Sequence, residues 1–190
     1  MAKLYNEIDD GLRAFIEAQQ VFFVATAPAG PDGHINLSPK GLGALRILGP
    51  RTVAYLDFTG SGVETIAHLR ENGRIVMMLC SFEGPPRIVR LHGRGRVIEP
   101  HDAEFSALLT HFTPAPGIRS IIRIEVDRIS DSCGYGVPLY RYEGARPQLI
   151  SWAERKGEVG LKEYQQKNNL SSIDGLPGLL FATGDGPQSS

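Results

Sequence analysis

The stretch YLDFTGSGVETIAHL, residues 55–69, decides the fold because its hydrophobic pattern changes from the period of a strand to that of a helix. The alternation stops at Phe58, and a Thr-Gly-Ser-Gly corner separates it from the helical pattern. Ser61 and Glu64 have the spacing of a capping box, which predicts that Ser61 caps the helix. The two glycines have a second interpretation, because bare backbone amides at the positive end of a helix can bind a phosphate.

Composition and charge limit what the protein can be. The chain has 190 residues, 42% of them hydrophobic, and a net charge of -1. We therefore expect one domain with a sizeable core and no general affinity for nucleic acid. No run reaches the ~18 apolar residues of a membrane helix, and the N-terminus lacks the apolar core of a signal peptide. We therefore expect no membrane partner. Because Cys80 and Cys133 are too few for a disulfide framework, we also expect a cytoplasmic protein.

Strand patterns outnumber helical ones on both sides of this stretch. Apolar residues recur at helical spacing over residues 7–19, and a third helical pattern lies near residues 102–112. Asn72 or Gly73 is predicted to end the helix that follows the corner, and Gly93 and Gly95 indicate a bulge inside a long strand. The predicted strands cover residues 21–27, 34–41, 52–58, 74–80, 85–99 and 120–130, and the first two should form a hairpin.

These elements favour a mainly β fold, an antiparallel barrel of six or seven strands with added helices. We assign residues 1–150 to the barrel domain, residues 151–170 to a helical extension of the same domain, and residues 171–190 to an irregular tail. Ser151 and Glu154 have the spacing of a second capping box at the start of the extension. Gly157 and Gly160 are points where its helix can be interrupted.

Several common sites are excluded by spacing. The segment GLGALR at residues 41–46 lacks the third glycine of a dinucleotide fingerprint, and no P-loop motif is present. The five histidines form no H-x-x-x-H pair, so we predict no metal site. No G-x-S-x-G elbow marks a serine nucleophile. Cys133 is either a reactive thiol or a small residue that packs at a turn, and packing is the more common case.

Basic residues suit an anionic ligand near the corner. Lys40 stands at the end of a predicted strand, and Arg87 and Arg90 stand near the start of another. Each of them is either a solvated surface charge or part of an anion site. One face of the strand that contains Arg90 is cationic, since basic and apolar residues alternate there. The basic residues of this face are Arg90, His92, Arg94 and Arg96. Together with the corner, these charges suggest a phosphate-bearing ligand.

The order of these elements resembles that of the FMN-binding split-barrel proteins of the pyridoxamine 5′-phosphate oxidase-like family. The resemblance extends over residues 10–130 and is most specific over residues 34–97, where strand, corner, helix, strand, proline-rich turn and R-x-V-R-type strand follow in order. The motifs SPKG, TGSG, FEGPPRI and CGYGVP together resemble an uncharacterised, oxidase-related bacterial subgroup. The resemblance implies a homodimer with FMN bound at the dimer interface.

The resemblance also implies which residues bind FMN. The corner and the first helical turn would hold the flavin phosphate, with positive charge from Lys40 and from Arg87 or Arg90. Asp57 and Phe58 would lie against the ribityl chain or the ring, and the amides of residues 38–41 would lie near its pyrimidine end. Trp152 either covers the flavin or anchors the C-terminal helix. The implied cofactor-binding residues are Ser38, Lys40, Asp57, Phe58, Thr59, Ser61, Gly62, Thr65, Arg87, Arg90 and Trp152.

The chain departs from the family pattern at two places. Where the family often has Ser-Arg-Lys at the corner, this chain has Ser61, Gly62 and Val63, so Lys40 and the arginines must neutralise the phosphate. The R-L-x-P-type segment of the vitamin B6 oxidases is absent from the C-terminal sequence SIDGLPGLLFATGDGPQSS. We therefore expect no oxidation of pyridoxamine phosphate.

The resemblance implies an FMN-dependent oxidoreductase that acts on a small molecule, with a nicotinamide or a deazaflavin cofactor as candidate reductants. No catalytic acid or base is assigned, since a flavin carries the electrons itself. Two other functions stay open. One is a carrier or sensor that binds flavin or haem without turnover, and the other is a deazaflavin-dependent reductase.

Overall fold

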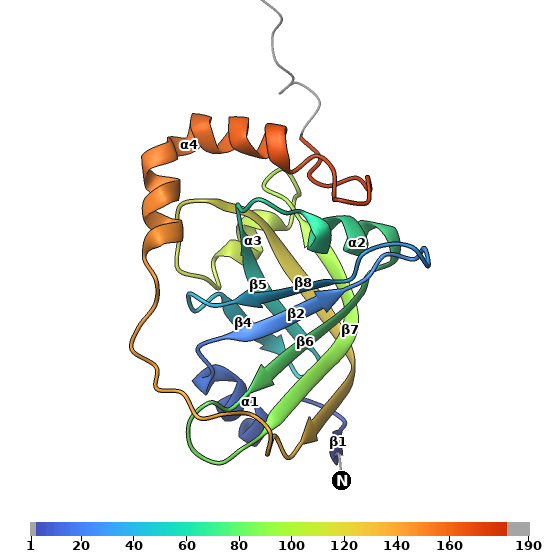
Figure 1. Ribbon diagram of the computed structural model, residues 1–190, viewed down its shortest axis with the longest axis vertical. Helices are drawn as coiled ribbons and strands as arrows, with labels where there is room; N and C mark the ends of the chain where they lie inside the picture. The colour runs from blue at the N-terminus through green and yellow to red at the C-terminus, as the bar shows by residue number, and fades with distance from the viewer. Residues whose placement is uncertain (1–2, 182–190) are drawn as a thin grey trace, which may run out of the picture.

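The computed structural model describes residues 3–181 and places eight strands in one sheet that curls into a barrel (Figure 1). The strands are β1 (Lys3–Tyr5), β2 (Phe22–Thr26), β3 (Asn36–Lys40), β4 (Leu45–Gly49), β5 (Thr52–Phe58), β6 (Arg74–Cys80), β7 (Ile88–Ile98) and β8 (Ile118–Ser132). The helices are α1 (Asp10–Ala18), α2 (Glu64–Asn72), α3 (Phe105–Leu109) and α4 (Gln148–Asn168).

The sheet is antiparallel throughout. Its strand order is β3-β2-β6-β7-β8-β5-β4, and β1 adds to the far end of β8. The predicted hairpin is confirmed, because β2 pairs with β3 in antiparallel register. The mainly β, antiparallel class predicted from the sequence is therefore confirmed, with β1 and β4 as two strands that the sequence pattern did not reveal.

The hydrophobic core lies inside the barrel and is closed by helices. Leu12 and Ile16 of α1 pack into the main core cluster, together with Tyr55 of β5 and Ile66 of α2. A second cluster lies between α3 and the adjoining faces of β5 and β8. Alternate residues of β2 are buried: Phe22, Val24 and Thr26 face the core, and the two residues between them are half-buried. This is the period expected of a strand with one covered face.

The longest strands, β7 and β8, pair along most of their length and contain the predicted bulge. Their register shifts between His92 and Gly93. A Cβ atom built on Gly93 would collide with the carbonyl oxygen of Glu125, so the two backbones approach more closely than any side chain allows. Gly95 lies two residues further along β7, where an added Cβ atom would collide with the side chain of Leu69 of α2.

Helix boundaries are the least well predicted features. The C-terminal cap of α2 is correct, because Gly73 adopts a left-handed conformation with φ of 69°. The predicted capping box is wrong, since α2 begins at Glu64, its N-cap is Val63, and no side chain caps it. The second capping box is wrong as well: α4 begins at Gln148, with Pro147 as N-cap. The third predicted helix is limited to the five residues of α3.

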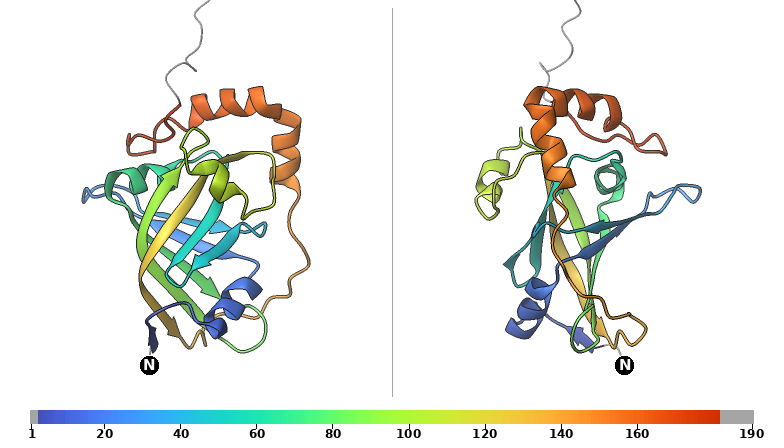
Figure 2. Two further views of the ribbon diagram at one scale, coloured as in Figure 1. Left: turned by 180° about the vertical axis from the view of Figure 1, so that it is seen from behind. Right: turned by 60° about the vertical axis from the view of Figure 1, so that its left-hand side comes forward.

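α4 bends around one end of the barrel, and the chain then returns over α2 (Figure 2). The bend is at Gly157, whose φ of 65° and ψ of 175° are not helical, so one of the two predicted interruption points is confirmed. We call residues 169–181 the strap. Leu179 of the strap is buried in the main core cluster. The last residues of the predicted tail, 182–190, lie outside the described residues.

Two absences hold for the described part of the chain. Within residues 3–181, no helix is long and apolar enough to cross a membrane. The same residues contain no group of three or more His, Cys, Asp or Glu side chains placed to hold a metal ion.

Candidate functional site

The corner between β5 and α2 presents open backbone amides at the start of a nine-residue helix. Within residues 3–181, no hydrogen bond is found to the amides of Gly60, Ser61 or Gly62, and Ser61 is exposed. Nothing lies within 4 Å of a Cβ built on Gly60. Because the first turn of a helix also carries a partial positive charge, this uncapped corner has the donors and the charge that an anion would need.

Lys40 reaches the base of the corner through a buried cluster of charges. Its Nζ lies 3.0 Å from Oδ1 of Asp57, whose side chain is fully buried. Nε of Arg119 lies 2.7 Å from Oδ2 of the same carboxylate, and Nη1 of Arg119 donates to the carbonyl oxygen of Gly62 at 2.8 Å. Two cations share one anion, so the cluster keeps a net positive charge beside the corner. We call Lys40, Asp57 and Arg119 the charge cluster.

The charge cluster holds Asp57 in its ionised form. Burial alone would raise the pKa of this carboxyl, but the charges and hydrogen bonds of Arg119 and Lys40 outweigh burial and lower the pKa to about 2. Asp57 is therefore a carboxylate at neutral pH, and its two oxygens are already engaged. It orients Lys40 and Arg119, and its side chain has no free surface for a cofactor.

A chain of polar side chains connects β3 to the first turn of α2. Asn36 donates to Oγ1 of Thr65 at 2.9 Å and to Oγ1 of Thr26 at 3.2 Å, and it accepts from Ser38 at 2.9 Å. Thr26 in turn contacts Nδ1 of His68 at 2.9 Å. Burial lowers the pKa of His68, so this imidazole is neutral at pH 7. These bonds fix β3, and with it Lys40, relative to the corner.

The strap and α4 hold the corner from the other side. Asn169, which is fully buried, donates to the carbonyl oxygen of Gly60 at 3.0 Å. Gln165 of α4 donates to Oγ1 of Thr59 at 2.8 Å. Thr59 itself donates to the carbonyl oxygen of Gly117 at 2.9 Å. Contacts from distant segments thus fix the corner: the carbonyl oxygens of Gly60 and Gly62 accept from protein side chains, while the amides of residues 60–62 stay open.

One acidic side chain lies at the corner. The carboxylate of Glu64 is so close to Gly62 that a Cβ on this glycine would collide with it. Glu64 is on the first turn of α2, where a negative charge is favoured by the helix dipole. The side chain of Glu64 is partly exposed, and its charge would oppose a second anion at this corner.

The structure brings most of the predicted residues together and separates two of them. Ser38, Lys40, Asp57, Phe58, Thr59, Ser61, Gly62 and Thr65 all lie at or beside the corner. Arg87 and Arg90 stand at the start of β7, at the end of the barrel where α1 and β1 lie, whereas α2 lies at the opposite end (Figure 1). Arg87 pairs with Asp131 at 3.0 Å, and Arg90 donates to Ser132 at 3.1 Å. Within one chain, these arginines do not meet the corner.

Two aromatic residues of the prediction are half-buried and contact other parts of the protein. Phe58 packs against the second core cluster, beside Ile118 at the start of β8. The indole of Trp152 meets the ring of Tyr164 edge-on, with centroids 5.0 Å apart, and so joins the two limbs of α4. This contact favours the prediction that Trp152 anchors the C-terminal helix.

Arg119 is the functional residue that the sequence interpretation missed. It is 62 residues from Asp57 in the sequence and 5% exposed. One signal pointed to it: an aspartate inside the apolar strand AYLDF has to be paired when buried, and Arg119 precedes the apolar run of β8. Asn36, Gln165 and Asn169 gave no comparable signal, because their roles depend on contacts between distant segments.

Comparison with known proteins agrees with this architecture. The family model described as "Pyridoxamine 5'-phosphate oxidase" matches residues 8–133. The pyridoxamine 5'-phosphate oxidase family protein ustO of Aspergillus flavus is 41% identical over 204 aligned positions, which cover 97% of this chain and 81% of the relative.

Solved structures share the fold at lower identity. The H111A variant of HupZ from group A Streptococcus superposes with a TM-score of 0.53 and 22% identity, covering 66% of this chain and 99% of that protein. A candidate pyridoxamine 5'-phosphate oxidase of Lactobacillus delbrueckii gives a TM-score of 0.51 and 17% identity, covering 67% of this chain and 98% of its own. These two likenesses support the fold alone. The family model and the fungal relative carry the assignment, and the chain belongs to the pyridoxamine 5′-phosphate oxidase family.

Proposed function

We propose that the protein is an FMN-dependent oxidoreductase that acts on a small molecule. The observation that carries the proposal is the corner, where open amides at the N-terminus of α2 lie beside the net positive charge cluster. A phosphate needs donors and positive charge, and both are already positioned there. Family membership adds the expectation of a flavin.

Each residue of the site then has a role in binding. The amides of residues 60–62 and the hydroxyl of Ser61 would donate to the phosphate, and Lys40 would supply charge. Asp57 directs the side chain of Lys40 through their ion pair, while Arg119 holds the corner through Gly62. When bound, the flavin supplies the acceptance and donation of electrons, and the protein supplies position and electrostatics. A nicotinamide or a deazaflavin cofactor would be the reductant.

The decisive test of the phosphate site is Lys40→Ala. Loss of one charge-assisted hydrogen bond costs roughly 1.5–3 kcal/mol, so FMN affinity should fall about 10- to 150-fold by the rule of tenfold per 1.4 kcal/mol. Riboflavin has no phosphate and should lose little. The measurement is a pair of fluorescence-quenching titrations, FMN and riboflavin, on wild type and variant.

Two further variants control this experiment. Lys3→Ala removes an exposed lysine at the opposite end of the barrel, so FMN affinity should change by less than about twofold. Glu64→Gln removes the carboxylate beside Gly62 and should strengthen FMN binding, opposite in sign to Lys40→Ala. Equal losses of FMN and riboflavin in Lys40→Ala would withdraw the phosphate assignment.

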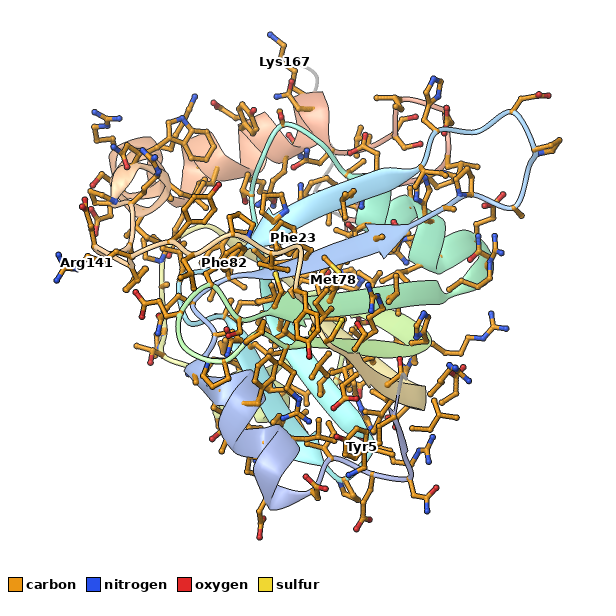
Figure 3. The ribbon with its side chains drawn as sticks, turned by 60° about the horizontal axis from the view of Figure 1, so that its bottom comes forward. Tyr5, Phe23, Met78, Phe82, Arg141 and Lys167 are labelled. Atoms are coloured by element: carbon orange, nitrogen blue, oxygen red, sulfur yellow. The ribbon has the colours of Figure 1, made fainter. Side chains whose placement is uncertain are left out.

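We also propose that the functional unit is a homodimer. The outer face of β2, β3 and β6 carries apolar side chains that the described residues leave wholly or partly uncovered: Leu37 is 65% exposed, and the half-buried Phe23 and Met78 lie opposite each other on neighbouring strands. Figure 3 shows Phe23, Met78 and Phe82 gathered on this side of the molecule. Exposed apolar surface of this kind is typical of an interface between chains.

The connection between β8 and α4 extends this apolar surface. Residues 133–147 form no helix or strand, yet Tyr140 contacts the ring of Phe82 at 5.5 Å between centroids and donates its amide to the carbonyl oxygen of Phe82 at 2.9 Å. Its large apolar side chains are nevertheless exposed: Tyr135, Leu139, Tyr140 and Tyr142. A second copy of the chain would cover them. It would also be the means by which Arg87 or Arg90 could reach a cofactor at the corner.

The dimer prediction is tested by light scattering. Wild type should have about twice the 20.7 kDa mass of one chain. Leu37→Asp places a charge on the outer face of β3 and should give monomers, because an unpaired charge in an interface is costly. Val159→Asp is the matched control, since Val159 is exposed to a similar degree but stands on α4. A monomeric wild type that still binds FMN would refute the dimer.

We expect no oxidation of pyridoxamine phosphate, because the R-L-x-P-type motif of the vitamin B6 oxidases does not occur in residues 169–190, and the strap instead holds Gly60 of the corner through Asn169. In an assay of hydrogen peroxide release, the FMN-loaded protein should turn over this substrate at less than about 0.1 per second, far below the ~10 per second median of enzymes. Flavin content measured on the same sample controls for loss of cofactor. Turnover near the median would show that another phosphate site replaces the missing segment.

A further inference from the structure

A cavity of about 640 Å³ lies between the barrel and α4. Its walls come from the residues that follow β7, from α3, from the start of β8, from both limbs of α4 and from the end of the strap. The bend at Gly157 directs α4 around this space, and Gly117, with φ of +83°, lets the loop before β8 approach Ala153. The volume falls within the range of about 300–1,000 Å³ typical of small-molecule sites.

Most of the cavity wall is apolar. The side chains that give it this character come from four different segments of the chain: Phe105, Leu109, Ile118, Leu161, Leu179 and Phe181. The side chains of Leu161 and Leu179 are buried by their contacts with the rest of the protein, so these two residues form a fixed part of the wall. A space of this size and lining favours a ligand with a flat or branched apolar body over water alone.

One buried cation faces the cavity. Arg119 lines it and is 5% exposed. Its Nε and Nη1 groups are engaged by Asp57 and by the carbonyl oxygen of Gly62. No hydrogen bond from its Nη2 group is found within residues 3–181, although a guanidinium has more N–H donors than these two bonds use. The charge cluster also has a surplus positive charge, because Lys40 shares Asp57 with Arg119.

The acidic residues of the wall do not cancel this cation. Glu99 is buried, but it pairs with Arg70 and accepts from the amide of Leu180 at 3.1 Å. Burial raises the pKa of Glu99, which these two partners oppose. Glu154 and Glu158 stand at exposed positions of α4, where water screens their charge. The buried part of the wall therefore has hydrogen-bond donors for an acidic ligand. It has no free acceptor of comparable burial for a basic one.

We propose that this cavity binds a small organic acid with an apolar body, whose acid group is held by Arg119. The site is separate from the phosphate corner, and the proposal does not depend on a flavin being bound. The two sites share a wall, because Arg119 contacts Gly62 and Gln165 contacts Thr59.

Two dyes with one ring system test the proposal. Anilinonaphthalene sulfonate carries an anionic group on an apolar body, and phenylnaphthylamine is the same ring system without the sulfonate. Titrations of the full chain, followed by dye fluorescence, should show that the sulfonate improves affinity about tenfold or more, as one charge-assisted contact would. No advantage of the sulfonate on wild type would overturn the proposal, and this comparison needs no variant.

Variants then locate the contact. Arg119→Lys keeps a positive charge for Asp57 but loses the planar guanidinium that can bond Asp57 and a ligand in the cavity at the same time. The advantage of the sulfonate should therefore fall below about threefold. Arg123→Lys is the matched control on the same strand, where the side chain pairs with Glu104 and Glu125 outside the cavity, and it should keep the advantage. Equal losses in both variants would overturn the role of Arg119.

A third variant and a competition complete the test. Leu109→Trp adds volume to the wall and should weaken both dyes at least about tenfold if they occupy the cavity. Unchanged affinities would place the dyes elsewhere and overturn the proposal. Calorimetric titration with the sulfonate dye, with and without saturating FMN, should give affinities within about twofold of each other. Displacement by FMN would mean that the cavity belongs to the flavin site, which also overturns the inference.

Discussion

Asp57→Asn is expected to lower the free energy of unfolding by about 3–5 kcal/mol, the range found when one partner of a buried ion pair is removed. Asparagine has nearly the same size, so the loss reports charge and not a cavity. Without the carboxylate, Arg119 is left at 5% exposure with no counter-charge, and Lys40 loses its only ion-pair partner within the described residues. The measurement is urea denaturation at neutral pH.

The matched control is Asp131→Asn. Asp131 also pairs with an arginine, Arg87, at 3.0 Å, but its side chain is 18% exposed and that of Arg87 is 29% exposed. Water can replace much of the lost interaction there, so we expect a loss of at most about 1 kcal/mol. If Asp57→Asn costs no more than Asp131→Asn, the charge cluster does not stabilise the fold as described.

The same substitution predicts a pH dependence. The pKa of Asp57 is lowered in the folded protein from 3.8 to about 2. The contribution of Asp57 to stability is therefore complete above the pKa of the unfolded chain, 3.8, and is lost as pH falls from 3.8 to about 2. At 1.36 kcal/mol per pKa unit, the shift corresponds to roughly 2–3 kcal/mol. The difference in stability between wild type and Asp57→Asn should therefore narrow between about pH 4 and pH 2. A constant difference over this interval would contradict the assignment.

Gly93→Ala is expected to destabilise the protein by about 3 kcal/mol, at the upper end for overpacked substitutions. The added Cβ would collide with the carbonyl oxygen of Glu125, and it would lie 2.9 Å from the carbonyl carbon of that residue and 3.0 Å from Cα of Val126. All three atoms belong to the backbone of β8, so they cannot move without separating the two longest strands of the barrel.

Thermal or urea unfolding measures this loss, with Gly30→Ala as the control. Gly30 has no atom within 4 Å of a built Cβ and lies in the loop between β2 and β3. Its replacement should change stability by less than about 0.5 kcal/mol. A small loss at Gly93 would show that the bulge can adjust, and that the close approach of β7 and β8 is not required.

Much of the barrel could be predicted because its signals are local. Runs or alternations of apolar residues identified β2, β3, β5, β6, β7 and β8, and glycine identified the bulge and the end of α2. β1 has three residues, and every residue of β4 is half-buried, so neither shows an alternation that can be recognised in the sequence. The capping-box prediction failed at Ser61 because contacts from distant segments fix the corner: Arg119 binds Gly62, and Asn169 binds Gly60.

The candidate site was predicted where one segment carries it and missed where several segments meet. Lys40 and the corner stand out in the sequence through lysine, glycine and a change of period. Lys40 reaches Asp57 because the barrel brings β3 close to β5. The two residues are 17 positions apart in the sequence, and their strands are not neighbours in the sheet. Arg119 is a stronger example, since only the pairing of β5 with β8 brings it to Asp57. Pairings of this range are decided by the whole fold.

The strap also determines when the protein can complete its folding during synthesis. Leu179 is buried in the same core cluster as Leu12 of α1, so residues near both ends of the described chain must be present before the core closes. While the ribosome is still making α4, the barrel strands exist but their interior is not sealed. We therefore expect the nascent chain to expose apolar strand surface, and to be prone to aggregation, until residue 179 has emerged.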